Sequence, residues 1–242
     1  MIIVKQWGIQ RSGTNAIRGL LERNFSNVTV FSSLLGWKHG CPGDPEAWIK
    51  EHAQPDDSVR FQGLHMLFTA TELRHMLKTC KMCHLVSVKE PEAFIVSHAA
   101  YRGQPLTDHE WVGRQIARYN NVYRSWWRLR SDNRPWACVM HSDLIGSPED
   151  TLLRLQRQFG LTRSQSQWSL IHNRMNRCTD CAKASAGDTP FNADWYRHRK
   201  YLDKLPVDTL RLIQEQTDQA LLADYRRFGR KRDPHHVPVL GL

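Results

Sequence analysis

The chain opens with residues 2–15, IIVKQWGIQRSGTN, and this stretch decides the fold. Its apolar beginning, Ile2–Trp7, is typical of a buried strand, and Ala16–Arg23 beyond the turn has a helical pattern. Between them, Gly8 and Gly13 bracket a polar turn whose backbone can close around a ligand without a Cβ clash. The unpaired N–H groups of a first helical turn, together with the helix dipole, favour anions. The turn therefore predicts a phosphate-binding site.

The glycine spacing of this turn is that of a P-loop, but the residues after it differ from one. Thr14 and Asn15 stand where a P-loop for nucleoside triphosphates has a lysine and a hydroxyl residue. Arg11 is the cation inside the turn. We therefore expect the turn to bind a phosphate group other than the γ-phosphate of ATP.

Strand and helix patterns alternate along the chain, which predicts an α/β fold with a mostly parallel central sheet flanked by helices. Ligands of such sheets bind at the carboxyl ends of the strands, so the first turn, Lys89 and Asp143 could share one crevice. Residues 173–190 are polar and are expected to be irregular. Strands are expected at residues 27–31, 59–64, 84–89 and 136–140, and helices at 45–52, 69–77, 93–101, 108–130, 147–159, 193–202 and 207–228.

The composition suits one globular domain. The chain has 242 residues, 40% of them hydrophobic, and no linker divides it, so we expect a single domain over residues 1–228 and a basic C-terminal tail at 229–242. It has no apolar run as long as a membrane span and no secretory signal pattern, which favours a cytoplasmic protein without a membrane partner. The net charge of +10 favours phosphorylated or polyanionic partners, although a generally basic solvated surface explains it as well.

The candidate functional residues occur in three segments, Gln10–Asn15, Val88–Ser97 and His141–Ile145. In the first segment an arginine precedes Ser-Gly-Thr. In the second, Lys89 is followed by a proline two positions on and by a serine eight positions on. In this order and spacing the segments resemble those of the sulfotransferase superfamily, enzymes that use 3′-phosphoadenosine-5′-phosphosulfate (PAPS).

The resemblance implies a P-loop NTPase-like sulfotransferase fold and an enzyme that transfers a sulfuryl group from PAPS to a hydroxyl or amine of a carbohydrate or small molecule. It implies that the 5′-phosphosulfate is bound by Arg11, Ser12, Gly13, Thr14 and Asn15, and the 3′-phosphate by Lys89 and Ser97. The family usually has arginine where this chain has Lys89, and an acid where it has Ser142. A lysine neutralises a phosphate without the forked contact of an arginine.

A sulfuryl transferase needs a positioned acceptor and stabilisation of its leaving group, as phosphoryl transfer does. The resemblance implies a histidine or glutamate base with a lysine nearby. We expect His39 to be that base, since Lys38 precedes it and glycines flank it; His65, just after the expected strand 59–64, is the alternative. Arg11 is expected to hold the sulfate or bridging oxygens.

The cysteines form two C-x-x-C pairs, Cys80 with Cys83 and Cys178 with Cys181. Each pair suits one half of a tetrahedral four-cysteine zinc site. The pairs are farther apart in sequence than in a zinc ribbon, and unrelated reduced thiols are the alternative. The resemblance does not imply this zinc site.

Two other functions fit parts of the sequence. A P-loop nucleotide kinase-like enzyme would use Asp143 as its magnesium-binding acid, but Thr14 replaces its lysine. A basic nucleic-acid-binding protein with a zinc clip would use the net charge, but it leaves the first turn and the spacing of Lys89 and Ser97 unexplained. The acceptor and the oligomeric state cannot be read from the sequence.

Overall fold

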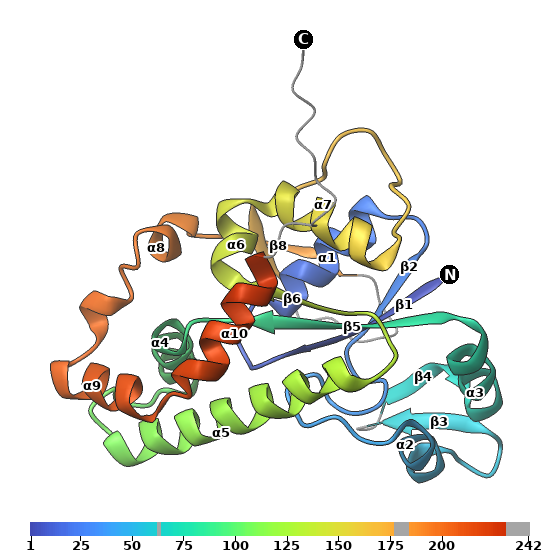
Figure 1. The fold of residues 1–242 in the computed structure, drawn as a ribbon, viewed down its shortest axis with the longest axis horizontal. Helices are drawn as coiled ribbons and strands as arrows, with labels where there is room; N and C mark the ends of the chain where they lie inside the picture. The colour runs from blue at the N-terminus through green and yellow to red at the C-terminus, as the bar shows by residue number, and fades with distance from the viewer. Residues whose placement is uncertain (62–63, 177–183, 231–242) are drawn as a thin grey trace.

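The computed structural model describes residues 1–61, 64–176 and 184–230. Its centre is a parallel sheet of four strands in the order β2-β1-β5-β6 (Figure 1). The strands are β1 Ile2–Gly8, β2 Val28–Phe31, β5 Lys81–Val88 and β6 Trp136–Met140. The expected α/β fold with a parallel central sheet flanked by helices is therefore confirmed. In the described residues, no helix is both long and apolar enough to cross a membrane.

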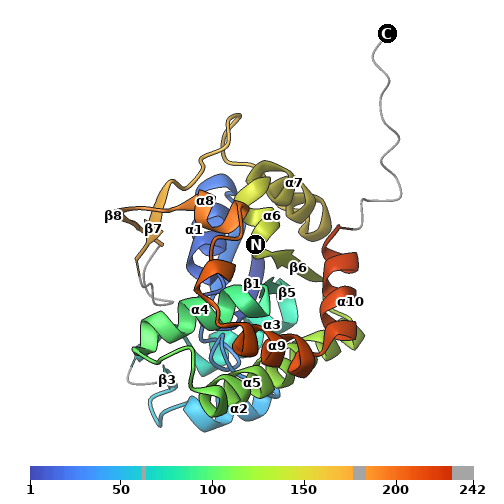
Figure 2. The same ribbon diagram turned by 90° about the vertical axis from the view of Figure 1, so that its left-hand side faces the viewer.

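Helices cover both faces of the sheet because the side chains of each strand alternate between two cores. On one face, Val4 packs with Leu20 and Leu155 beneath α1 (Thr14–Asn24), α6 (His141–Gly146) and α7 (Pro148–Phe159). On the other face, Trp7 packs with Tyr123 beneath α4 (Pro91–Arg102), α5 (His109–Arg128) and the C-terminal helices α9 (Val207–Gln216) and α10 (Gln219–Arg230). Figure 2 shows these two helical layers on either side of the strands.

A smaller unit packs against β1 and β2, where Ile3 near the start of β1 and Phe31 at the end of β2 join its apolar core. It consists of α2 (Pro45–His52), the antiparallel hairpin of β3 (Ser58–Phe61) and β4 (Leu64–Thr69), and α3 (Ala70–Thr79). Helix α3 begins with a capping box: the Thr69 hydroxyl accepts a hydrogen bond from the Glu72 backbone N–H, and the Glu72 carboxylate accepts one from the Thr69 backbone N–H. The expected single strand 59–64 is wrong, because β3 ends at Phe61 and Leu64 begins its antiparallel partner β4.

The C-terminal third also departs from the sequence-based expectation. Residues 173–190, expected to be irregular, contain the hairpin strands β7 (Asn173–Met175) and β8 (Ala186–Pro190). The expected helix 193–202 is only α8 (Ala193–Arg197), followed by the short 3-10 turn η2 (Leu202–Lys204). The expected helix 207–228 is two helices, because the Asp218 side chain accepts a hydrogen bond from the Leu221 backbone N–H and starts α10. Helix α10 ends at Arg230 and so includes residues 229 and 230, the first two of the expected tail. Residues 231–242 lie outside the described part.

The strand order reverses direction between β1 and β5. The chain leaves β1 for β2 on one side and later returns to β5 on the other. In parallel α/β sheets, ligands bind in the crevice outside the carboxyl ends of the strands where the order reverses in this way. That crevice is bordered by the loop after Gly8 and by Lys89, the residue that follows β5.

Candidate functional site

The first loop, residues 8–13, joins β1 to α1 and depends on both of its glycines. A Cβ on Gly8 would lie 2.6 Å from the Ser12 hydroxyl oxygen and 2.7 Å from a Thr14 methyl carbon. Gly13 has a φ of +82°, in the left-handed region that other residues rarely adopt. The loop therefore has the close backbone approach that its sequence predicts.

The first loop presents donors suited to an anion. The Ser12 hydroxyl is buried and has no hydrogen-bond partner among the described residues. Helix α1 begins at Thr14 without a side-chain cap, so its first-turn N–H groups face the loop. Arg11 has an exposed side chain and a left-handed backbone, with a φ of 66°. These groups fit a phosphate or phosphosulfate, because each is a donor or a positive charge.

Lys89 joins this loop to α4. Its side chain is fully buried, and Nζ donates hydrogen bonds to the Arg11 carbonyl oxygen at 3.0 Å and to the Ser97 hydroxyl oxygen at 2.9 Å. Burial, and next the charge of Arg11, lower the pKa of Lys89 to about 7. Ser97 donates its own hydrogen to the Phe94 carbonyl oxygen, 3.1 Å away. The structure therefore brings the two predicted anion-binding clusters into direct contact.

Tyr196 and His141, to which the sequence analysis gave no role in the site, complete this cluster. Tyr196 lies with its ring centroid 4.8 Å from Lys89 Nζ and stacks on Phe191 at 5.5 Å with an interplanar angle of 9°. His141 meets the Tyr196 ring edge-on at 4.7 Å and lies against Gly13. Burial, followed by the charge of Lys89, holds the pKa of His141 well below its ordinary value. The position of His141 directly after β6, at the same edge as Lys89, is the signal that could have identified it.

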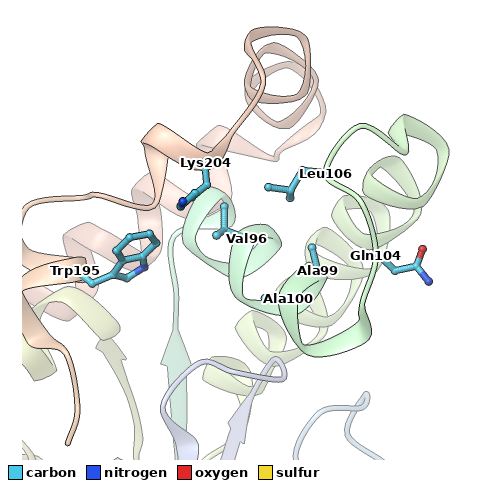
Figure 3. Close-up of a pocket in the computed structure, with 7 residues that line it drawn as sticks. All are labelled: Val96, Ala99, Ala100, Gln104, Leu106, Trp195 and Lys204. Carbon is cyan, nitrogen blue, oxygen red and sulfur yellow. The ribbon is translucent and has the colours of Figure 1, made fainter.

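A cavity of about 400 Å³ opens between α4, α8 and η2 beside this cluster (Figure 3). Its walls include Val96 and Trp195, the chain neighbours of Ser97 and Tyr196, and Lys204. The walls are mainly apolar. Such walls suit an uncharged group of a ligand.

Lys38 and His39 lie on the other side of the first loop. The His39 Nδ1–H donates to the Gly8 carbonyl oxygen, and Lys38 Nζ donates to the Asn15 side-chain oxygen at 2.7 Å. Because a carbonyl oxygen can only accept, the proton of the neutral imidazole is on Nδ1 and Nε2 carries the lone pair. Burial, helped by the charges of Lys38 and Arg118, lowers the pKa of His39 to about 3, although the hydrogen bond to Gly8 acts in the opposite direction. His39 is therefore a neutral acceptor of protons next to the loop.

The segment that carries Lys38 and His39 is held by a buried cation which the sequence analysis did not single out. Lys5 of β1 is fully buried, and its Nζ donates to the carbonyl oxygens of Ser32 at 2.7 Å and Gly36 at 2.6 Å. Charge-assisted hydrogen bonds of this kind are among the strongest in proteins. The apolar residues around Lys5 in the sequence predict a strand, but they do not predict that Lys5 holds this segment.

Two other predicted residues lie elsewhere. His65, the alternative base, lies exposed in β4, where it pairs with Arg60 in the separate hairpin sheet. Asp143 lies in the first turn of α6 and not directly at the end of β6. The structure thus brings Lys38 and His39, but not His65, to the first loop.

The cysteines do not converge in the described residues. Cys80 is partly exposed at the end of α3, and Cys83 is buried within β5. They pack in cores on opposite faces of the sheet, and burial raises the pKa of the Cys83 thiol to about 11. Cys178 and Cys181 lie outside the described residues, and the part that is described holds no group of three or more potential metal ligands. The four-cysteine zinc site stays a prediction, and the placement of Cys80 and Cys83 does not support it.

No model of a known protein family matches the chain, and no curated protein is similar to it in sequence. The site must therefore be interpreted from its own chemistry. It can bind anionic groups at two contacting clusters, the first loop and the Lys89–Ser97 pair, with a neutral histidine on the opposite side of the loop.

Proposed function

We propose that this chain is a sulfotransferase that moves a sulfuryl group from PAPS to a hydroxyl or amine acceptor. The observation that carries the proposal is the contact of Lys89 Nζ with both the Arg11 carbonyl oxygen and the Ser97 hydroxyl. A nucleotide with a phosphosulfate at one end and a phosphate at the other needs two anion sites within one crevice.

In this proposal the first loop and Lys89 bind the two charged ends of the nucleotide. Ser12, Arg11 and the first-turn N–H groups of α1 bind the 5′-phosphosulfate. Lys89 and Ser97 bind the 3′-phosphate. Because the pKa of Lys89 is about 7, the lysine takes up a proton when the phosphate arrives, and its full positive charge then faces the anion.

His39 acts as the base for the acceptor. Its Nε2 accepts the acceptor's proton as the acceptor oxygen or nitrogen forms a bond to sulfur. The bond from sulfur to the phosphate oxygen breaks, and the electron pair leaves with adenosine 3′,5′-bisphosphate. Arg11 and Lys38 stabilise the charge that grows on the leaving group. Burial is the main cause of the low pKa of His39, and the charges of Lys38, Arg118 and Lys5 add to it; the donor's negative charges offset these cations, which raises the basicity of His39 in the complex.

The kinase-like alternative has one observation in its favour. Lys38 Nζ reaches Asn15 in α1 and so places an ammonium group beside the first loop, although Thr14 replaces the P-loop lysine. A kinase would bind ATP with magnesium more tightly than adenosine 3′,5′-bisphosphate. The nucleic-acid alternative is supported only by the net charge of +10.

Titration calorimetry separates these functions. We expect adenosine 3′,5′-bisphosphate to bind at least tenfold more tightly than ATP with magnesium, and a short DNA duplex to bind only weakly at 150 mM salt. A screen of hydroxyl and amine acceptors with a labelled sulfate donor then tests for transfer. Tighter binding of magnesium ATP, or of DNA, would favour the corresponding alternative.

A further inference from the structure

Residues 36–40, the segment that carries Lys38 and His39, lie between β2 and α2, outside any helix or strand. The shape of this segment therefore depends on its contacts with other elements. It lies along the end of β1, where the Gly8 N–H donates to the Lys38 carbonyl oxygen at 2.9 Å and the His39 Nδ1–H donates to the Gly8 carbonyl oxygen. A shift of this main chain would move the His39 ring with respect to the first loop.

The end of the segment that follows His39 is held by Trp126 of α5. The indole Nε1–H of Trp126 donates to the Gly40 carbonyl oxygen, 2.9 Å away. At the other end of the segment, Lys5 Nζ donates to the Gly36 carbonyl oxygen at 2.6 Å. Two buried side chains from different elements, one in β1 and one in α5, thus hold the two ends of the segment that carries the candidate base.

The Trp126 ring is itself fixed by packing in the core. It is fully buried and meets the Tyr123 ring edge-on, with the centroids 5.0 Å apart and an interplanar angle of 89°. The Trp7 ring lies 6.4 Å from it, and the Trp7 indole N–H donates to His84 Nδ1 at 3.2 Å. A donor whose rotamer is locked in this way holds its acceptor at a defined place. Trp126 therefore fixes the position of Gly40, and not the reverse.

Trp136 provides a comparison within the same core. It is also buried, and its indole N–H donates to the main-chain carbonyl oxygen of Trp126 at 3.1 Å. Each of the two indoles thus donates one hydrogen bond to a main-chain carbonyl. The bond from Trp136 ends in α5, whereas the bond from Trp126 ends in the segment with His39. Loss of the N–H affects this segment directly only at Trp126.

We propose that Trp126 is a positioning residue of the candidate active site, whose indole N–H holds Gly40 and thereby aims His39 Nε2 at the acceptor. This inference rests on the proposed function for the role of His39 as the base, but not for the anchoring of the segment. Misplacing a reacting group by about 1 Å costs on the order of 10²-fold in rate. Nucleotide binding should be spared, because the Trp126 indole bonds neither the first loop nor the Lys89–Ser97 pair.

The test compares Trp126→Phe with the control Trp136→Phe, since each change removes one indole N–H and the same ring volume from the core. A third protein carries 3-benzothienylalanine in place of Trp126. This analogue has the shape of tryptophan but sulfur in place of the N–H, so it decides the question if Trp126→Phe does not fold.

Three properties are measured for each protein. Turnover and the KM for PAPS are measured with labelled PAPS and a mixture of 2-naphthol, tyramine and N-acetylglucosamine as acceptors. Calorimetry gives the affinity for adenosine 3′,5′-bisphosphate. Amide hydrogen exchange, followed by mass spectrometry, reports on residues 36–41 and, for comparison, on the central strand β5.

We expect both Trp126 replacements to lose turnover tenfold or more, while the KM for PAPS and the bisphosphate affinity stay within about twofold of wild type. Amide exchange of residues 36–41 should become tenfold or more faster, while that of β5 stays as in Trp136→Phe. The control should keep turnover within about threefold of wild type and leave the exchange of residues 36–41 unchanged.

The proposal is refuted if both Trp126 replacements turn over as fast as the control, if the control loses as much, or if exchange rises equally in β5. A tenfold loss of bisphosphate affinity also refutes it, since Trp126 would then support the nucleotide site as a whole. If wild type sulfates none of these acceptors, hydrogen exchange alone decides whether Trp126 holds the segment. If wild type also fails to bind the bisphosphate, the proposed function fails, and the anchoring of the segment is still decided by hydrogen exchange.

Discussion

At the scale of single residues, the buried Lys89 is the most informative group in the molecule. Burial, followed by the charge of Arg11 and opposed by that of Glu90, lowers its pKa from 10.5 to about 7, so the folded protein holds it at a cost in stability. Such a cost is typical of functional sites, where a group is kept for a ligand rather than for the fold. The family resemblance implies a phosphate-binding role for Lys89 and Ser97, which stays a prediction, but the sequence could not reveal the contact of Lys89 with the Arg11 carbonyl, which requires β1 and β5 to be neighbours.

Replacing Lys89 by methionine should raise the free energy of unfolding at pH 7.5. For the wild type, the unfolded chain binds a proton that the folded protein lacks between pH 7 and the ordinary lysine pKa near 10.5, so its stability rises across this window. The slope from this residue approaches about 1.4 kcal/mol per pH unit. Urea unfolding of wild type and Lys89→Met at several pH values measures both effects. A less stable variant, with the wild-type slope retained, would contradict this account of Lys89.

His39 should matter for the rate but not for nucleotide binding. Loss of a general base costs roughly 10²–10⁴-fold in rate. We therefore expect His39→Gln to lose turnover by that factor while its dissociation constant for adenosine 3′,5′-bisphosphate stays within about twofold. His65→Gln is the comparison, since His65 lies exposed in the separate hairpin sheet. A larger loss of turnover in His65→Gln than in His39→Gln would reverse the choice of base.

At the scale of elements, helices and strands with a regular apolar pattern were predicted well, and those with mostly polar residues were predicted poorly. The strand Trp136–Met140 and the helix Pro45–His52 have the expected bounds, because each has a clear apolar pattern with defined ends. The hairpin of β7 and β8 was missed, since its residues are mostly polar and partly exposed, without the alternation that predicts a strand. Helices α9 and α10 were merged because Asp218, and no glycine or proline, separates them.

A prediction at the scale of elements concerns the glycine at the start of the first loop. Gly8→Ala should abolish nucleotide binding and destabilise the protein by about 1–3 kcal/mol, because the added Cβ displaces the Ser12 hydroxyl and the start of α1. Gly43→Ala is the matched control, as a Cβ there meets nothing within 4 Å. Calorimetry and urea unfolding compare the two variants. Wild-type nucleotide affinity in Gly8→Ala would show that the close approach at Gly8 is not needed.

At the scale of the whole molecule, the sequence predicted the layers but not the strand order. Alternating strands and helices indicate a parallel sheet, whereas the neighbours of each strand depend on long crossovers that no local pattern encodes. The order β2-β1-β5-β6 places the first loop beside Lys89 and Ser97. The same packing adds Tyr196 and His141, which are distant in sequence and were not predicted as site residues.

The buried histidines make the whole protein sensitive to acid. Burial lowers the pKa of His39 to about 3 and those of His84 and His98 to about 4, whereas the unfolded chain titrates near 6.5. Between these values the unfolded state binds more protons, so stability is fully present above pH 6.5 and is lost as the pH falls. Each histidine contributes about 1.4 kcal/mol per pH unit in this window. Urea unfolding at pH 7 and pH 5 should show a loss of several kcal/mol, and equal stability at both pH values would contradict the burial of these rings.

The central claim, that the first loop and the Lys89–Ser97 pair bind both ends of one nucleotide, is tested most directly by a calorimetric cycle. The affinities of adenosine 3′,5′-bisphosphate and of adenosine 5′-monophosphate are measured for wild type and for Lys89→Met. We predict that wild type prefers the bisphosphate by at least tenfold, about 1.4 kcal/mol, and that the variant binds both nucleotides equally. An equal preference in both proteins, or none in wild type, would contradict the claim.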